Sequence, residues 1–381
     1  MKGLLETPYG TRDFLPKEAA AKRAIEQKIL NLFASFGYEE VVTPTMEYLE
    51  TLTTSSGRAI EPNLFKMFDR NNRTLALRHE MTTPIARLAV NRLKDSPLPL
   101  KLSYNTNVFR FRTNQTGRQC EFYQAGVELL GISNAFADAE VIALAAQALK
   151  VSGLENFKIC LGQVEFAGGL MENLPSEVQT QIKSAIERHD IVALNNFDID
   201  DALKKIPTLQ GGVEVLSAAE KFAVSEKSRR ALENLKEIYR LLEIYGVADK
   251  ITFDLGLIRD FEYYTGMVFE AYSAGVGYSL AGGGRYDNML KDFGAECPAT
   301  GFAVGIERIL DAIKFQGVAE GSRAKDFYFS YASGNEFAAI SKAAELRSKG
   351  KVVELSLNAQ TKAEAEKSCA EKFCTELVYL A

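Results

Sequence analysis

The sequence predicts an α+β fold: an antiparallel sheet flanked by helices, with a helical insertion and a small α/β domain near the C-terminal end. Three observations lead to this prediction. Apolar residues recur at helical spacing over residues 16–36, 82–93 and 135–151. Residues 100–131 contain two strand-like stretches around a polar loop, which indicates a β-hairpin. After a polar linker at 317–325, strand-like and helical stretches alternate, which is typical of a βαβ unit.

The first elements follow from local signals along the chain. A helix over 16–36 begins at a proline, which suits a first helical turn, and Gly37 can end it. A short strand over 38–44 ends at another proline. The next helix starts at Thr82 or Thr83, since either side chain can cap it. An N-cap role is also the simplest account of Glu80.

The second strand of the hairpin has two different faces. Alternation places one set of residues on a face that can pack under helices: Tyr123, Ala125, Val127 and Leu129. The opposite face carries Phe122, Gln124, Gly126 and Glu128. Two long polar side chains around a glycine can form a flat floor for a small ligand. A solvated sheet face gives the same alternation and is the commoner case, so spacing alone favours the solvated face over the ligand floor.

The middle of the chain predicts further strands and an inserted helical subdomain. A strand is expected over 157–161, followed by a mostly helical, polar insertion at about 165–248. Residues 251–284 are strand-like and punctuated by glycines, and a last core helix covers 305–315. We therefore expect a core domain over 1–320 and a second domain over 326–381.

Three further motifs each allow a structural and a functional interpretation. Arg259, between apolar neighbours, is either a paired structural cation or a clamp for an anion. The run AGGGRYD is expected to form a tight turn before a helix, and because no GK[ST] follows, it is not a phosphate-binding P-loop. Arg308 lies in the first turn of the last core helix, where it either faces solvent or reaches into a cleft.

Composition excludes several classes of protein. The 45 basic and 50 acidic residues give a net charge of −5, which is mildly unfavourable for a protein that grips a long nucleic acid. No apolar run is long enough to cross a membrane, and the N-terminus lacks the features of a signal peptide. Five cysteines without a CxxC pair indicate a reduced, cytoplasmic protein. With two histidines we expect no structural zinc, and no motif indicates a cofactor.

Six segments, taken in order, resemble the signature segments of histidyl-tRNA synthetases, a family of class II aminoacyl-tRNA synthetases. They are GTRDFLP, LRHEMT, NVFRFR with GRQCEFYQAGVE, LIRDFEYYTGMVFE, AGGGRYD and PATGFAVGIERI. The resemblance runs from about residue 7 to residue 315 and continues more faintly beyond. It implies a class II synthetase-like core that dimerises through its motif-1 region, and a truncated anticodon-binding-like domain over 326–381.

The resemblance also implies a pocket for histidine. The positions that surround the amino acid and its carboxylate in that family correspond here to Glu80, Thr82, Arg110, Gln124, Glu128, Tyr263, Tyr264, Tyr286 and Arg308. Arg259 falls on the position that assists activation. The chemistry fits, because carboxylates can accept from an ammonium or an imidazole, while Arg110 or Arg259 can bind a carboxylate in a bidentate fork. We expect none of these residues to be catalytic in this chain and none to bind a metal.

The sequence departs from the synthetase pattern where ATP would bind. The glutamate that accepts from the adenine amine is missing, and Phe111 and Arg112 occupy that stretch, neither of which has an acceptor. Cys120 replaces a basic residue, and the loop 113–116 lacks the basic residues of the family. Further replacements are at His79, Met81 and Asp260. The ATP-activating pocket is therefore expected to be lost.

A synthetase-like chain with the histidine positions but without the ATP contacts resembles the regulatory subunits of hetero-oligomeric ATP phosphoribosyltransferase. The resemblance implies a non-catalytic chain that activates a short-form catalytic subunit and confers feedback inhibition by L-histidine, as a homodimer within a hetero-octamer. Residues 326–381 carry eight acidic and seven basic residues, so tRNA is not expected as a partner. The alternatives are a histidyl-tRNA synthetase with atypical ATP contacts, and a stand-alone histidine-binding or RNA-binding paralogue.

Overall fold

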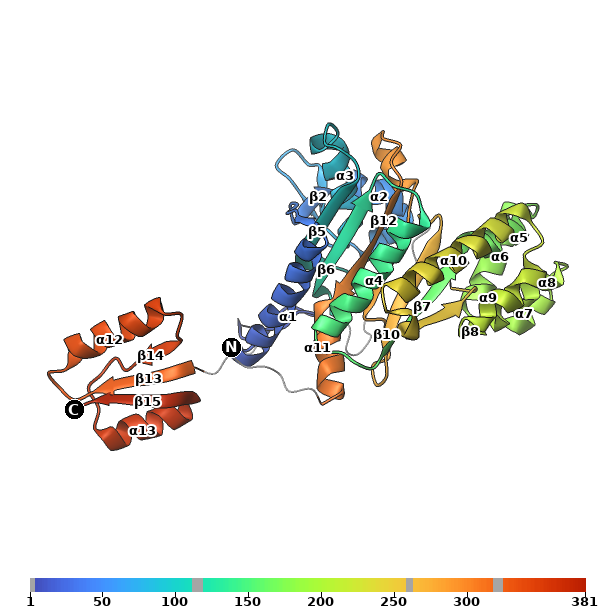
Figure 1. Ribbon diagram of the computed structural model, residues 1–381. Helices are drawn as coiled ribbons and strands as arrows, with labels where there is room; N and C mark the ends of the chain where they lie inside the picture. Colours follow the sequence, from blue (N-terminus) through green and yellow to red (C-terminus); the bar gives the residue numbers. More distant parts are fainter. Residues whose placement is uncertain (1–3, 112–118, 258–262, 318–324) are drawn as a thin grey trace. The chain divides into compact units, whose positions relative to one another are not determined.

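The computed structural model describes residues 4–111, 119–257, 263–317 and 325–381, and it divides into two compact units, Met1–Glu320 and Gly321–Ala381. The described part of the larger unit is built on a nine-stranded sheet (Figure 1). From edge to edge the strands are β1 (Glu39–Glu40), β5 (Leu100–Phe109), β6 (Glu121–Leu130), β12 (Ala299–Gly305), β11 (Ala281–Arg285), β10 (Met267–Ser273), β7 (Phe157–Gln163), β9 (Ile251–Asp254) and β8 (Gln210–Gly211). Neighbours are antiparallel except β1 with β5 and β7 with β9, so the predicted α+β class with a mainly antiparallel sheet is confirmed.

One face of this sheet packs against helices that the periodicity predicts. These are α1 (Pro16–Ser35), α4 (Ala135–Val151) and α11 (Ile306–Phe315), and Figure 1 shows α4 lying across β6 and β12. Ala125, Val127 and Leu129 of β6 are buried in the same hydrophobic core as these helices. The apolar face expected for the second hairpin strand is therefore confirmed.

The opposite face carries a smaller core under α3 (Thr82–Arg92) and the 3-10 helix η6 (Met289–Phe293). The chain between β1 and α3 forms a second, small sheet of β2 (Met46–Tyr48), β4 (Thr74–Leu77) and β3 (Lys66–Phe68). The same stretch contains α2 (Leu49–Ser56) and η2 (Arg58–Asn63). Sequence periodicity did not predict this second sheet, because its strands are only three or four residues long.

The glycine-rich run at 281–285 is not the tight turn that the sequence predicts. It forms β11, which pairs with β10 on one side and β12 on the other. A Cβ on Gly283 would lie 2.1 Å from the Gly301 carbonyl oxygen, and one on Gly284 would lie 2.8 Å from the ring of Tyr264. The glycines therefore allow close approach of neighbours within a sheet, and pairing on both sides overrides their local preference for turns.

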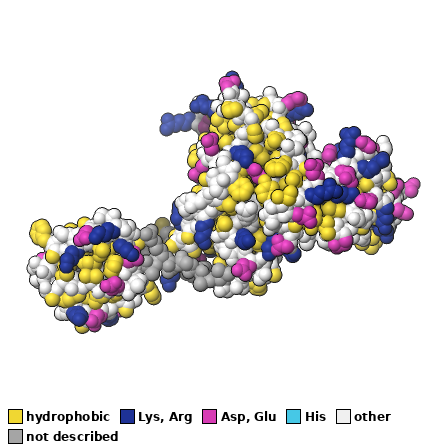
Figure 2. All heavy atoms as spheres, viewed as in Figure 1, with side chains coloured by type: hydrophobic (Ala, Val, Ile, Leu, Met, Phe, Trp, Pro, Cys, Tyr) yellow, Lys and Arg dark blue, Asp and Glu magenta, His cyan; other side chains and the backbone are white. Residues whose placement is uncertain are grey.

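Apart from the two-residue strand β8, the elements between β7 and β9 are helices, in agreement with the mostly helical stretch that the sequence predicts there. They are α5 (Val164–Met171), α6 (Ser176–Glu187), α7 (Ile191–Asn195), α8 (Asp201–Lys205), η3 (Ile206–Thr208), α9 (Glu214–Ala219), η4 (Glu220–Phe222), α10 (Glu226–Ile244) and η5 (Ala248–Lys250). The long helix α10 packs on α4 and α5. Figure 2 shows basic and acidic side chains interspersed over the visible face of these helices, without a patch of one sign.

The smaller unit is a three-stranded parallel sheet with two helices. Its elements are β13 (Lys325–Tyr331), α12 (Glu336–Ser348), β14 (Val353–Leu355), α13 (Lys362–Glu371) and β15 (Cys374–Leu380), and β13 lies between the other strands. Tyr328 packs against α13 and the adjacent Phe329 against α12, because successive residues of a strand face opposite sides. The predicted βαβ pattern is confirmed. Within the described ranges, none of the helices has the length and apolar character needed to cross a bilayer.

Candidate functional site

A cavity of about 440 Å³ in the larger unit brings together the predicted site residues that the structure describes. Its lining includes Glu80, Thr82, Arg110, Gln124, Glu128, Tyr263, Tyr264, Tyr286 and Arg308. These side chains come from α3, β6, α11 and the ends of β5, β10 and β11, so distant parts of the chain meet at one place. Arg259, Arg112 and Asp260 lie outside the described residues.

The floor of the cavity is the polar face of β6 beside β12. Gly301 pairs with Glu128, and a Cβ on this glycine would lie 2.0 Å from the Glu128 Oε2 atom. A Cβ on Gly126 would lie 2.4 Å from the hydroxyl oxygen of Tyr104, its partner on β5. Both neighbours are fully packed, and the Glu128 residue is 2% exposed. The solvated-face interpretation of this strand is therefore wrong, and the glycines make room for buried polar side chains.

Glu128 is the centre of a buried hydrogen-bond network. The Thr82 hydroxyl donates to Oε1 at 3.0 Å, and the Tyr286 hydroxyl donates to Oε2. Burial raises the pKa of Glu128 to about 8, with a further rise from the nearby Glu80 carboxylate, while the two hydroxyl donors act in the opposite direction. The carboxyl is thus close to titration at neutral pH, and a ligand that donates an N–H to it would favour its ionised form.

The start of α3 differs from the N-cap prediction for Thr82 and Thr83. The Glu80 carboxylate accepts from the backbone N–H of Thr82 at 2.5 Å and of Thr83 at 3.0 Å. Glu80 therefore satisfies the first amides of the helix, and its negative charge suits the positive end of the helix dipole. Because the cap is supplied from Glu80, the Thr82 hydroxyl can reach Glu128 instead.

Two arginines line the cavity where secondary-structure elements end. The Arg110 Nε atom donates to the His79 carbonyl at 2.9 Å, and its guanidinium lies 5.3 Å from the centre of the Phe122 ring. The Arg308 Nη1 atom donates to the Ser279 carbonyl at 2.5 Å, and its guanidinium lies 5.3 Å from the Tyr278 ring centre. Arg308 therefore reaches into the cavity, as one of its two interpretations proposed.

Aromatic rings form a wall of the cavity. The ring centres of Tyr263 and Tyr264 are 4.8 Å apart, and those of Tyr263 and Tyr286 are 5.9 Å apart. Burial raises the pKa of Tyr286 well above its ordinary value, with Glu128 adding to the rise. Tyr104 belongs to the floor but was not predicted. The signal for it was available, since a tyrosine opposite Gly126 in a regular hairpin fills the space that the glycine leaves.

The region of the expected ATP contacts contains packed side chains. Cys120 is buried, and a Cβ on Gly10 would lie 2.4 Å from its Sγ atom, so the N-terminal segment covers this position closely. The Phe111 residue is 41% exposed and packs edge-on against Phe65. Across the ranges that the structure describes, no group of three or more histidine, cysteine, aspartate or glutamate side chains is arranged to hold a metal ion.

The chain is similar to two groups of known proteins. Residues 10–309 match the family model described as histidyl-tRNA synthetase. An ATP phosphoribosyltransferase regulatory subunit from Moorella thermoacetica is 42% identical, covering 97% of this chain and 96% of the relative. One from Acetivibrio thermocellus is 38% identical, covering 92% of this chain and 87% of the relative.

Two solved structures have the same architecture. The ATP phosphoribosyltransferase regulatory subunit/histidyl-tRNA synthetase from Bacillus halodurans C superposes with a TM-score of 0.88 at 33% identity, covering 99% of both chains. A histidyl-tRNA synthetase from Nostoc sp. PCC 7120 superposes with a TM-score of 0.84 at 20% identity, covering 99% of this chain and 92% of the other, which shows a shared fold. The expected class II synthetase-like fold is confirmed.

Proposed function

The chain belongs to the family of ATP phosphoribosyltransferase regulatory subunits, and we propose that it activates a short-form catalytic subunit and confers feedback inhibition by L-histidine. It is the non-catalytic partner in the first step of histidine biosynthesis, and the glycosyl transfer itself takes place on the catalytic subunit. The proposed assembly is a hetero-octamer that contains this chain as a homodimer. A cytoplasmic location, expected from the cysteine content, is part of the same proposal.

The observation that carries this function is the buried Glu128 carboxylate on the pocket floor. An imidazole ring has an N–H that such a carboxylate can accept, and each carboxylate oxygen has two lone pairs. Thr82 and Tyr286 each use one acceptor site, which leaves acceptor capacity for a ligand. The rings of Tyr263 and Tyr264 supply aromatic surface against which the imidazole can pack. A buried carboxylate beside aromatic rings on the floor of a cavity thus suits a histidine side chain.

The remaining residues suit the amino and carboxylate groups of the amino acid. Glu80, Thr82 and Gln124 line the cavity and offer oxygen acceptors for an ammonium. Glu80 already accepts two backbone amides, so its contact with the ligand would be shared with the helix cap. Arg110 and Arg308 line the same cavity and are the proposed partners of the ligand carboxylate, together with Arg259.

The synthetase alternative receives less support from the ATP side of the pocket. A thiol carries no fixed positive charge for a phosphate, and Cys120 lies under Gly10, where a longer basic side chain would displace the N-terminal segment. Phe111 has no hydrogen-bonding group for an adenine amine. The residues proposed to bind histidine are therefore present, whereas Phe111 and Cys120 offer no equivalent contacts for ATP.

Exposed apolar side chains support the proposed homodimer. Val42 is 86% exposed, Phe68 is 73% exposed and Met46 is about half exposed. They lie on or beside the small sheet that contains β2 and β3. Apolar side chains gathered on one exposed surface are typical of protein interfaces, and we propose that these three belong to such a surface.

Two measurements test the proposal together. The chain alone should give no histidine-dependent exchange of pyrophosphate into ATP, and added to a short-form catalytic subunit it should raise the rate of phosphoribosyl transfer in a histidine-sensitive manner. Pyrophosphate exchange by the chain alone would support the synthetase alternative. Activation without any histidine sensitivity would place the effector site elsewhere, and histidine binding without activation would favour a stand-alone histidine-binding protein.

A further inference from the structure

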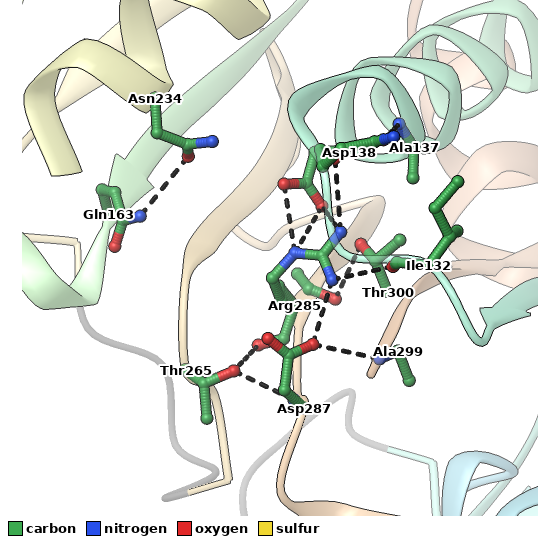
Figure 3. A network of polar contacts seen from close by, with 12 residues as sticks. Ile132, Ala137, Asp138, Gln163, Asn234, Thr265, Arg285, Asp287, Ala299 and Thr300 are labelled. Carbon is green, nitrogen blue, oxygen red and sulfur yellow. Dashed lines mark hydrogen bonds and ion pairs between the residues drawn. The ribbon is translucent and has the colours of Figure 1, made fainter. Parts of the chain in front are cut away.

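A buried ion pair connects the pocket wall to the helix on the other side of the sheet. Arg285 of β11 and Asp138 in the first turn of α4 are 6% and 1% exposed. The Nε and Nη2 atoms of Arg285 donate to Asp138 Oδ1 at 3.0 and 2.8 Å (Figure 3). The fork geometry fixes the orientation of the guanidinium as well as its position.

The same guanidinium also holds the residue that follows Tyr286. Its Nη1 atom donates to Asp287 Oδ1 at 2.9 Å, and that oxygen also accepts the Ala299 N–H at 3.0 Å. The Asp287 N–H donates to the Thr265 hydroxyl at 2.9 Å, and the Thr265 N–H donates to the Arg285 carbonyl at 2.8 Å. Figure 3 shows these groups converging on Arg285.

Three residues of this network are immediate sequence neighbours of the pocket tyrosines. Arg285 and Asp287 flank Tyr286, and Thr265 directly follows Tyr263 and Tyr264. Because successive residues of an extended chain face opposite sides, Arg285 points toward α4 while Tyr286 points into the cavity. Asp138, Arg285, Asp287 and Thr265 are absent from the lining of the cavity, yet they fix the backbone that carries its aromatic wall.

We infer that the Asp138–Arg285–Asp287–Thr265 network is a positioning device that sets where the Tyr286 hydroxyl meets Glu128, and with it the affinity and selectivity of the pocket for histidine. The inference rests on the proposed function, since it concerns the same ligand. A hydrogen bond between two buried groups depends on its distance and angle, so small displacements of Tyr286 weaken it. Asp138 and Thr265, which are each more than 20 residues from Tyr286 in the sequence, thereby act on the ligand through Tyr286.

A second ion pair on α4 provides a matched control. Glu140, two residues after Asp138, pairs with Lys101 of β5 at 2.8 Å and also accepts from the Tyr38 hydroxyl. This pair also joins α4 to the sheet, and neither Glu140 nor Lys101 lines the cavity. Loss of either pair should lower stability, but only loss of the Asp138 pair should change histidine recognition.

The experiment is calorimetry of the full chain with L-histidine and with a histidine methylated on the imidazole nitrogen. Asp138→Asn and Arg285→Lys should weaken histidine binding by about tenfold or more with an unchanged number of sites. They should also lower the ratio between the dissociation constants of methylhistidine and histidine, because the N–H acceptor is no longer held in place. Glu140→Gln should change the histidine affinity by less than about twofold.

Each outcome decides the inference. Unchanged affinity and selectivity in the Asp138 and Arg285 variants would overturn it. A fall in the number of sites with unchanged affinity would overturn it too, because that result describes partial unfolding. If those variants do not fold, Thr265→Val decides, since it keeps the ion pair and removes the hydroxyl that accepts from Asp287. If the parent chain binds no histidine, the proposed function fails and the inference fails with it, whereas normal parent binding with insensitive variants rejects the inference alone.

Discussion

Replacing Glu128 by glutamine should move stability and ligand affinity in opposite directions. Burial raises the pKa of Glu128 from the ordinary 4.5 to about 8. When folding raises the pKa of a group, its contribution to stability is fully present at pH values below the unfolded-state pKa. This contribution is lost as the pH rises toward the folded-state pKa. At about pH 7 the buried carboxyl therefore lowers the free energy of unfolding by up to about 3 kcal/mol relative to a neutral group.

The glutamine variant removes the pH-dependent destabilisation that comes from burying the carboxyl. It adds a smaller destabilisation that does not depend on pH. Its NH₂ group must face either the Thr82 or the Tyr286 hydroxyl, which now donates to the carboxylate, at a cost of about 1 kcal/mol. Near pH 5 the two effects nearly cancel, and near pH 8 the variant should be the more stable protein by about 3 kcal/mol. For a unit of this size the Tm should rise by about 2–5 °C at the higher pH.

Histidine binding should fall in the same variant, because an amide oxygen is a weaker acceptor than a carboxylate. Hydrogen bonds to charged groups contribute about 1.5–3 kcal/mol, against about 1 kcal/mol for neutral pairs, so we expect an affinity loss of about tenfold. Thermal melts of the parent and variant across pH, with calorimetry at each pH, measure both effects. Glu121→Gln, on the same strand but outside the cavity lining, is the control for affinity. A Tm difference that does not grow with pH would refute the desolvation argument, and unchanged affinity would refute the ligand contact.

Three further predictions follow from the pocket. Gly301→Ala places a Cβ 2.0 Å from Glu128 Oε2, so histidine binding should be lost in calorimetry and the free energy of unfolding should fall by about 1–3 kcal/mol. Gly277→Ala, also on the cavity lining but with open space at its Cβ, should behave like the parent, and equal effects of the two would contradict the packing argument. Tyr286→Phe removes a donor that lowers the pKa of Glu128, so the pH at which histidine affinity is half-maximal should move upward, and an unmoved midpoint would be evidence against the contact. A chain ending at Glu320 should keep its histidine affinity within about twofold, because every cavity residue belongs to the larger unit, and a tenfold loss would show that the terminal unit contributes.

The fold was largely predictable because its main elements have clear periods. The helix α1 buries an apolar stripe, and α4 has apolar residues at helical spacing. The strands β5 and β6 are ten residues long, and apolar side chains recur at alternate positions of their sequence. The strand β11 was not predictable from local signals. Three successive glycines favour a turn in isolation, and only the strands on either side, β10 and β12, hold the run extended.

The resemblance names residues that the structure brings together around one cavity, but it does not predict their environment. Alternation alone identifies the face that contains Gln124 and Glu128, yet it cannot distinguish a solvated face from a pocket floor. That difference depends on β12, where Gly301 lies beside Glu128 although the two are far apart in the sequence. The cap at α3 was ambiguous for a related reason. A glutamate two residues before a helix can hold backbone amides or a ligand, and the tertiary position of Thr82 decides how the two roles are divided.

The floor and the rim of the pocket should contribute differently to regulation. Histidine can shift the catalytic subunit between states only if it binds the inhibited assembly better than the active one. Glu128 lies on a strand paired on both sides and packed against Gly301, so it cannot change position without disruption of the sheet. Arg110 and Arg308 lie where strands and helices begin or end, outside the regular pairing of the sheet, and donate to the carbonyl groups of His79 and Ser279. Contacts with the imidazole should therefore determine which ligand binds, in the free chain and in the assembly alike. Contacts with the carboxylate of the ligand, made at the rim, are where a difference between the two assemblies can arise.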